Sequence, residues 1–147
     1  MALLPSGTYS ISKPNEQLLS LAGPKEPVVL IPPAEGELEA QSWEVEELDN
    51  GNVLLRNQRH RVLAGYEGYP QENAEVVGSS EGREWELRQA GGPDGSRFHI
   101  VVPGGRAGGE ELALDISVLD IFPTRIALRP LDVDDRQQAW GFLIHLP

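Results

Sequence analysis

Three short stretches, each centred on a tryptophan, decide the fold that this chain is expected to adopt. They are Gln41-Ser42-Trp43-Glu44-Val45, Arg83-Glu84-Trp85-Glu86-Leu87 and Gln138-Ala139-Trp140-Gly141-Phe142. Each begins a run in which apolar and polar residues alternate, and this pattern predicts a β-strand with one buried face. A large aromatic residue at the same place in three strands indicates a repeated core position. We therefore predict that all three tryptophans are buried.

Strand starts at equal intervals support a threefold repeat. Gly7, Asn52 and Arg97 each open a strand-like run, and they lie 45 residues apart. The turn residues Asp49-Asn50-Gly51 and Gly92-Pro93-Asp94-Gly95 precede the second and third runs, and such sequences supply the positive φ of tight hairpins. The chain is thus predicted to be a single domain over residues 1–147, with repeats at about 7–51, 52–96 and 97–147.

Four strands can be assigned to each repeat. They are expected at 8–12, 18–21, 28–31 and 42–48, at 52–57, 60–64, 74–77 and 84–89, and at 97–102, 112–116, 125–128 and 138–146. The 16 glycines and 12 prolines argue against long helices, although 118–122 could form one helical turn before Pro123. Twelve strands in three units with one tryptophan each predict an all-β fold, the β-trefoil, in which six strands close a barrel and six form capping hairpins.

Composition narrows the classes of function. The chain has 147 residues and no cysteine, which excludes disulfides and thiolate metal sites. Its net charge of −11 disfavours nucleic acid as a partner. No apolar stretch is long enough to suggest a membrane partner, and the N-terminal residues do not resemble a signal peptide, so we expect a cytoplasmic protein. We also expect it to be a monomer.

No residue pattern predicts catalysis. His60, His99 and His145 are scattered without metal-ligand spacing. The glycine-rich run 104–109 lies between two predicted strands, which favours a hairpin loop over a phosphate cradle. The acidic run 132–135 lacks the glycine and glutamate of an EF-hand. The sequence therefore predicts a binding module that is not an enzyme and needs no cofactor or metal.

The loop between the second and third strands is the first candidate binding site. Lys25 lies between Pro24 and Pro27, and it is the only basic residue between Pro14 and Leu55. Prolines push their preceding residues toward extended backbone, so we expect a preformed, substrate-like segment. Trypsin-like serine proteases select Lys or Arg through a pocket aspartate. The predicted protease-binding residues are Gly23, Pro24, Lys25, Glu26 and Pro27.

Two loops of the second repeat are further candidates. Asn57-Gln58-Arg59 is expected to be a short, exposed, polar turn with a basic residue. The segment 66–70 is rich in glycine and aromatic residues, which suits either sugar stacking or protein contact. The secondary site candidates are Asn57, Arg59, Tyr66 and Tyr69.

Several segments resemble one known family. Ser6-Gly7-Thr8-Tyr9-Ser10-Ile11, Val28-Val29-Leu30-Ile31-Pro32, Ser42-Trp43-Glu44-Val45 and Glu84-Trp85-Glu86-Leu87 are similar to the mushroom β-trefoil serine protease inhibitors of the cospin and cnispin group. The resemblance implies a fungal, cytoplasmic, disulfide-free defence protein that inhibits trypsin-like enzymes through the loop 22–27. A weaker resemblance to the mycocypin cysteine protease inhibitors implies contact with asparaginyl endopeptidase through Asn57 or Asn73.

A carbohydrate-binding lectin is the alternative function. Gln41-Ser42-Trp43 and Gln138-Ala139-Trp140 fit the Q-x-W signature of ricin-B-type trefoils, and Arg83-Glu84-Trp85 nearly does. Sugar binding in that family also requires an aspartate, an aromatic platform and an amide in one unit. No unit meets all three requirements: the first two have no aspartate before their tryptophan, and the third has no Tyr or Trp between its second strand and Trp140.

Overall fold

The computed structural model describes residues 4–13, 17–33, 38–91, 96–107, 110–119 and 121–145, which form twelve strands and two short 3₁₀ turns. The strands are β1 (Gly7–Ser12), β2 (Leu18–Leu21), β3 (Val28–Ile31), β4 (Trp43–Glu47), β5 (Val53–Asn57), β6 (Leu63–Gly65), β7 (Val77–Ser79), β8 (Glu86–Gly91), β9 (Arg97–Ala107), β10 (Glu110–Ile116), β11 (Thr124–Pro130) and β12 (Trp140–Ile144). The 3₁₀ turns are η2 (Glu39–Gln41) and η3 (Arg136–Gln138), each just before a tryptophan-bearing strand.

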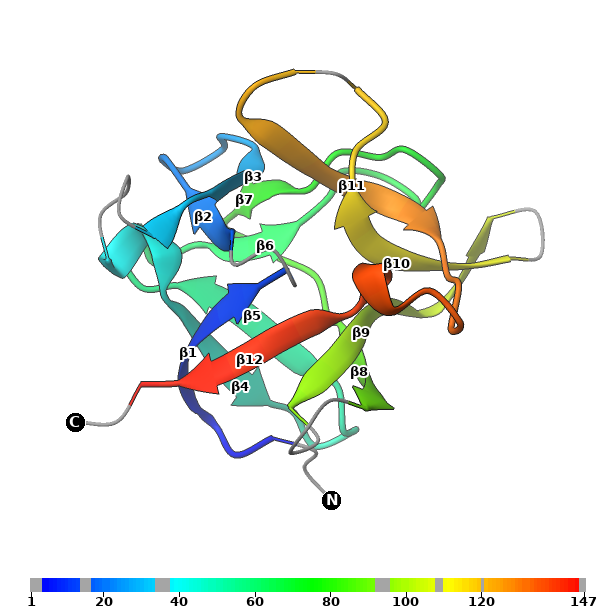
Figure 1. Cartoon of the computed structure of the whole chain (residues 1–147), viewed down its shortest axis with the longest axis horizontal. Helices are drawn as coiled ribbons and strands as arrows, with labels where there is room; N and C mark the ends of the chain where they lie inside the picture. The colour runs from blue at the N-terminus through cyan, green and yellow to red at the C-terminus, as the bar shows by residue number, and fades with distance from the viewer. Residues whose placement is uncertain are drawn as a thin grey trace.

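Strands β1, β4, β5, β8, β9 and β12 close a ring (Figure 1). Antiparallel pairing joins β1 to β4, β4 to β5, β8 to β9, β9 to β12, and β12 back to β1. The remaining gap is closed by a bridge between Val53 and Trp85, whose backbone groups exchange hydrogen bonds of 2.8 and 2.9 Å. Closure leaves no open edge within this barrel.

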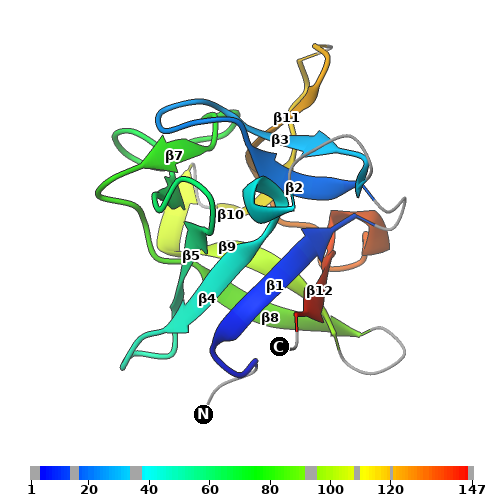
Figure 2. The ribbon, with the colours of Figure 1, turned by 90° about the vertical axis from the view of Figure 1, so that its left-hand side faces the viewer.

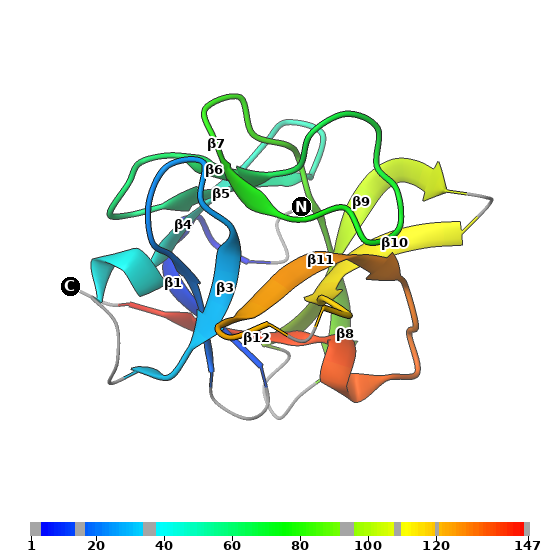
Figure 3. The same ribbon diagram turned by 90° about the horizontal axis from the view of Figure 1, so that it is seen from above.

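The other six strands form three hairpins, β2–β3, β6–β7 and β10–β11, on one side of the barrel (Figure 2). From above, β3, β7 and β11 lie around a common centre (Figure 3). Val28 N–H donates to Val76 O at 2.9 Å, and Val76 N–H donates to Ile126 O at 3.0 Å. Thr124 pairs with Leu30, which joins the third hairpin back to the first.

All three tryptophans are fully buried, as predicted. Each indole N–H donates to a backbone carbonyl of the preceding hairpin: Trp43 to Leu19 at 2.9 Å, Trp85 to Ala64 at 3.2 Å, and Trp140 to Leu114 at 3.0 Å. A buried indole N–H without an acceptor would destabilise the folded protein. These three bonds therefore fix the position of each hairpin on the barrel.

Most predicted strands are present, and the differences are local. The second strand of the middle unit was predicted at 60–64 but lies at Leu63–Gly65. The cause is a tight turn, in which Asn57 Oδ1 accepts hydrogen bonds from the backbone N–H groups of Arg59 and His60, and Arg61 has a φ of 59°. The third strand of that unit was predicted at 74–77 but lies at Val77–Ser79.

Two loop predictions need correction. Residues 104–107 were expected in a hairpin loop, but they extend β9; residues 108 and 109 lie outside the described residues. The segment 118–122 forms no helical turn in its described part, and its apolar side chains point into solvent, with Phe122 87% exposed. In the described ranges, no helix has the length and apolar character that crossing a bilayer requires.

Candidate functional site

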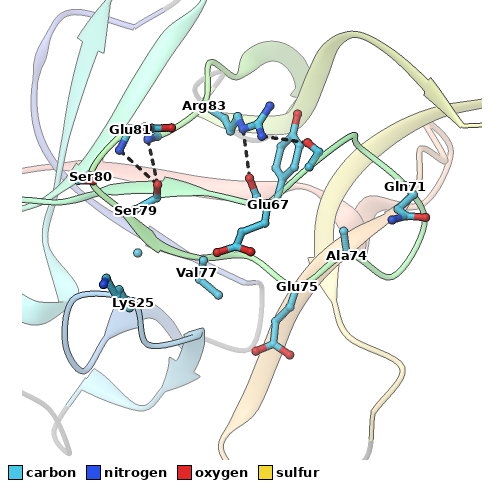
Figure 4. Close-up of a pocket in the computed structure, with 14 residues that line it drawn as sticks. Lys25, Glu67, Gln71, Ala74, Glu75, Val77, Ser79, Ser80, Glu81 and Arg83 are labelled. Atoms are coloured by element: carbon cyan, nitrogen blue, oxygen red, sulfur yellow. Dashed lines mark hydrogen bonds between the residues drawn. The ribbon is translucent and has the colours of Figure 1, made fainter.

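A pocket of about 860 Å³ opens beside the β6–β7 connection (Figure 4). We call it the β6–β7 pocket. Its walls come from the connection itself, from β7, from the turn before Trp85 and from one residue of the β2–β3 turn. The lining residues are Lys25, Tyr66, Glu67, Gly68, Gln71, Ala74, Glu75, Val77, Gly78, Ser79, Ser80, Glu81, Gly82 and Arg83. The pocket thus combines residues of the first and second predicted repeats.

Arg83 supports one wall of this pocket. Its Nε donates to Tyr66 O at 3.1 Å, and a terminal nitrogen donates to Gly68 O at 2.9 Å. The guanidinium also lies 4.5 Å from the centre of the Tyr66 ring. The ring packs edge-on against Trp85 with centroids 5.8 Å apart. Burial raises the pKa of the Tyr66 hydroxyl, and the nearby Arg83 charge opposes this shift.

The turn that follows β7 is shaped by Ser79. Its Oγ accepts hydrogen bonds from the backbone N–H groups of Glu81 at 3.3 Å and Gly82 at 3.2 Å. Gly82 has a φ of 62°, which favours glycine. A Cβ atom at Gly82 would lie 2.5 Å from Cβ of Leu63, so the turn packs directly on β6. These contacts hold the turn and Arg83 in place.

Three carboxylates line the pocket. Glu75 pairs with Arg125 of β11 at 3.3 Å through both oxygens. Figure 4 shows the Glu67 side chain reaching into the middle of the pocket. Among the described residues, the carboxylates of Glu67 and Glu81 have no hydrogen-bond or ion-pair partner. Glu67 and Glu81 are therefore the acceptors available to a ligand, together with the side chain of Gln71.

Lys25 lies at the pocket, but its backbone differs from the prediction. The expectation of an extended segment was wrong: Lys25 has a φ of 69°, and Glu26 N–H donates back to Gly23 O at 3.1 Å, which makes a tight turn. The turn is anchored to β7, because Lys25 N–H donates to Gly78 O at 3.1 Å and Gly78 N–H to Glu26 O at 3.0 Å. Pro27 continues this contact as a bridge to Val77. Pro24 and the Lys25 side chain are exposed.

The secondary candidates separate into different environments. Asn57 was expected on an exposed turn, but it is fully buried and its amide donates to Ala40 O at 2.9 Å, so its role is structural. Arg59 is exposed and does not line the pocket. Tyr66 lines the pocket but is only 7% exposed, and Tyr69 of the same connection is 88% exposed. The structure thus places Lys25 and Tyr66 at one pocket, whereas Asn57, Arg59 and Tyr69 do not line it.

A second cavity, of about 600 Å³, lies beside β10 and β11. Its lining residues are Glu110, Asp115, Arg129, Pro130, Leu131, Asp132, Asp135 and Gln138. Asp115 is already engaged there. One carboxylate oxygen accepts from Lys13 Nζ at 3.0 Å, and the other accepts from the Gln138 amide at 3.3 Å. Both oxygens of the Asp115 carboxylate in this cavity are therefore already bonded to protein donors.

Lys13 is a buried cation that sequence reasoning missed. Its side chain reaches from the end of β1 to η3 and β12, where Nζ also donates to Gln137 O at 2.8 Å and Gln138 O at 3.1 Å and lies 4.1 Å from the centre of a Trp140 ring. Burial lowers the pKa of Lys13, and Asp115 opposes the shift. The alternating pattern of a strand does not show that a lysine at its end will meet a partner such as Asp115, far away in the chain.

The histidines do not form a reactive group. His99 is buried, with Nε2 lacking any hydrogen-bond partner in the described part of the chain, and His145 Nε2 lies 2.5 Å from Ser10 Oγ. Within the described ranges, no three His, Asp or Glu side chains come together in a way that could hold a metal ion.

No protein-family model and no curated protein matches the chain. Solved structures do. The ricin B-like lectin of Macrolepiota procera, in complex with lactose, has a TM-score of 0.76 and 22% identity, over 97% of this chain and 99% of that one. The Rhizoctonia solani agglutinin has a TM-score of 0.75 and 21% identity, over 97% of each chain. The designed threefold-symmetric protein ThreeFoil has a TM-score of 0.76 and 16% identity, over 93% of this chain and 98% of that one.

These similarities show the fold alone: the chain is a β-trefoil. None of these three similarities shows that the chain belongs to the inhibitor group that the sequence resembles. Glu67 lies in the candidate segment 66–70 but was not singled out, and Gln71 and Glu81 were not predicted, since exposed polar residues in a loop carry no distinctive spacing. Arg83 could have been found, because it occupies the place of the glutamine in the Q-x-W signature.

Proposed function

We propose that the protein binds carbohydrate and that the β6–β7 pocket holds the sugar. The observation that carries this proposal is a pocket of about 860 Å³ that is open to solvent. Its unpaired polar side chains can form hydrogen bonds to a ligand, and they are not arranged as a catalytic group. Sugars present hydroxyl groups that donate to carboxylates and amides, and Glu67, Glu81 and Gln71 offer such acceptors. The fold shared with a lactose-bound lectin supports the same class of ligand.

The aromatic part of the site differs from the expected platform. One face of Tyr66 lies under Arg83 and its edge meets Trp85, so this ring stabilises the wall and is not open to stacking. Tyr69 is 88% exposed on the same connection, between two lining residues, Gly68 and Gln71. Tyr69 is therefore the ring that we assign to an apolar sugar face.

The test is a glycan array followed by calorimetry with the best glycan. Glu67→Gln should weaken binding about tenfold, because a hydrogen bond to a charged acceptor contributes about 1.5 kcal/mol. Glu47→Gln is the matched control: Glu47 is an exposed carboxylate on β4, outside the pocket. Likewise Tyr69→Ala should weaken binding, whereas Phe122→Ala should not, although the two rings are equally exposed.

An array without any bound glycan would refute carbohydrate binding. Binding that is equally strong in the wild type, Glu67→Gln and Tyr69→Ala would keep the function but remove it from this pocket. The cavity that contains Asp115 would then be the next place to examine, with Asp115→Asn.

Inhibition of a trypsin-like serine protease is the second candidate. It is favoured by an exposed Lys25 on a turn whose backbone is bonded to Gly78 on both sides. The positive φ of Lys25 weighs against it, since a protease cleft accepts an extended segment. Trypsin assays with the wild type and Lys25→Ala separate the outcomes: inhibition lost with the lysine supports this function, and no inhibition by either protein rejects it.

A further inference from the structure

The β4–β5 turn carries an asparagine followed directly by a glycine, and the proposed sugar site does not use it. Asn50 and Gly51 are both exposed. Gly51 has a φ of 89° and donates its N–H to Leu48 O at 2.9 Å. The side-chain oxygen of Asn50 accepts from Asn52 N–H at 2.9 Å. Because Gly51 lacks a Cβ atom, its backbone nitrogen can approach the Asn50 side chain more closely than in any other residue pair.

We propose that Asn50 is a site of spontaneous deamidation and that Glu84 controls the rate of the reaction. The Gly51 backbone nitrogen loses its proton to solvent and attacks Cγ of Asn50. The new N–Cγ bond closes a five-membered imide, the Cγ–Nδ2 bond breaks, and Nδ2 leaves as ammonia. One water then opens the imide at either carbonyl, which gives an aspartyl or an isoaspartyl residue. One water is consumed and one ammonia is released, without oxidation or reduction.

Glu84 restrains this reaction from the facing segment. Its Oε1 accepts from Nδ2 of Asn50 at 2.8 Å and from Nδ2 of Asn52 at 3.0 Å. These bonds fix the Asn50 amide in one orientation. The attacking nitrogen of Gly51 is meanwhile bonded to Leu48 O, so the turn must open before Cγ can be reached. Losing the Glu84 acceptor makes that opening easier.

Deamidation would change the contact between the two segments. A donor that faces Glu84 becomes a carboxylate, and the net charge of the chain moves from −11 to −12. Two carboxylates at hydrogen-bond distance repel each other. Glu84 directly precedes Trp85, which closes the barrel with Val53. The modification therefore loosens the turn next to the point at which β5 and β8 meet.

The chain provides internal controls for the experiment. Asn73 is exposed like Asn50, but Ala74 follows it, and Asn52 of the same turn is followed by Val53. A side chain on the following residue hinders attack by its nitrogen. We therefore expect Asn50 to react faster than both.

The test is ageing of the purified full-length chain in mildly alkaline buffer. Peptide mapping then measures the mass gain of each asparagine, and isoaspartyl methyltransferase labels the rearranged product. In the wild type, Asn50 should convert ahead of Asn73 and Asn52. Glu84→Ala should convert Asn50 about threefold faster, the factor that one modest hydrogen bond gives to an opening equilibrium. Glu84→Gln keeps the acceptor and should stay close to the wild type.

Conversion of Asn50 no faster than that of Asn73, in both the wild type and Glu84→Ala, would overturn the proposal. Equal rates at Asn50 in the wild type and Glu84→Ala would overturn the role of Glu84. A general loosening of the variant would show as faster conversion of Asn73 in the same sample, and that result would also remove Glu84 as a specific control.

Discussion

The guanidinium of Arg83 lies 4.5 Å from the centre of the Tyr66 ring and is hydrogen-bonded to the backbone carbonyl of the same residue. In the first and third predicted repeats the corresponding residues are Gln41 and Gln138, whose amides donate to Pro32 O at 3.2 Å and Pro130 O at 2.9 Å. In the predicted second repeat, an arginine therefore holds a different segment, the β6–β7 connection. This difference accompanies the larger of the two cavities described above.

Replacing Arg83 should loosen the pocket wall. Arg83→Ala removes two hydrogen bonds and the cation–π contact, and it should lower the free energy of unfolding by about 2 kcal/mol. Denaturant titration measures this loss, and hydrogen exchange should accelerate at residues 66–70. Arg61→Ala is the control, because the Arg61 side chain is exposed and pairs with Glu44, and its loss should change stability by less than about 1 kcal/mol. Equal losses in the two variants would contradict the role of Arg83.

Removing the buried Lys13 should be more costly. Lys13→Met leaves the Asp115 carboxylate and the carbonyls of Gln137 and Gln138 without their donor, and breaking a buried pair in this way costs about 3 kcal/mol. Lys25→Met is the matched control, since Lys25 is the other lysine of the chain and its side chain is exposed. Thermal unfolding compares the two. A Lys13 variant as stable as the Lys25 variant would show that the buried pair contributes nothing.

The sequence predicted the architecture because the architecture is set by repeated apolar burial. Trp43, Trp85 and Trp140 can be identified as core positions from their residue type and from the alternating pattern around them, and the barrel and hairpins were predicted from these positions. The division of the chain into three repeats of about 45 residues stays a prediction. The β2–β3 turn was predicted less well. Prolines near Lys25 favour extended neighbours locally, but hydrogen bonds to Gly78, far away in the chain, hold Lys25 at positive φ.

The site was harder to predict than the fold, because it too depends on contacts between residues far apart in the chain. The β6–β7 pocket joins Lys25 to residues 66–83, and only the docking of two hairpins brings them together. Asn57 illustrates the opposite error: a polar residue at the end of a strand suggests an exposed turn, but its side chain satisfies three backbone groups inside the fold. Local patterns do not reveal which buried backbone groups need a partner.

Alkaline pH should destabilise the protein through Tyr9. Its hydroxyl donates to Pro5 O at 2.6 Å, and burial raises its pKa above the usual 10.0. The unfolded chain then loses its proton at a lower pH than the folded one, so the stabilisation is complete below pH 10 and is lost as the pH rises through the folded pKa. Tyr9→Phe should show a smaller loss of stability between pH 9 and about 11 in denaturant titrations. Parallel curves for the two proteins would exclude Tyr9 as the titrating group.

Gly82 should tolerate no side chain. Its φ of 62° is unfavourable for other residues, and a Cβ atom there would lie 2.5 Å from Cβ of Leu63, a strand residue that cannot move without disturbing β6. Overpacking and backbone strain together should lower the free energy of unfolding by about 3 kcal/mol in Gly82→Ala.

Gly68→Ala isolates the backbone contribution, because Gly68 has a φ of 71° with no atom within 4 Å of the added methyl, and it should lose about 1 kcal/mol. Denaturant titration of both variants gives the difference, which is the contribution of the contact between the turn and β6. If the two variants lose the same amount, this contact does not hold the turn, and the pocket wall must be positioned by Arg83 and Ser79 alone.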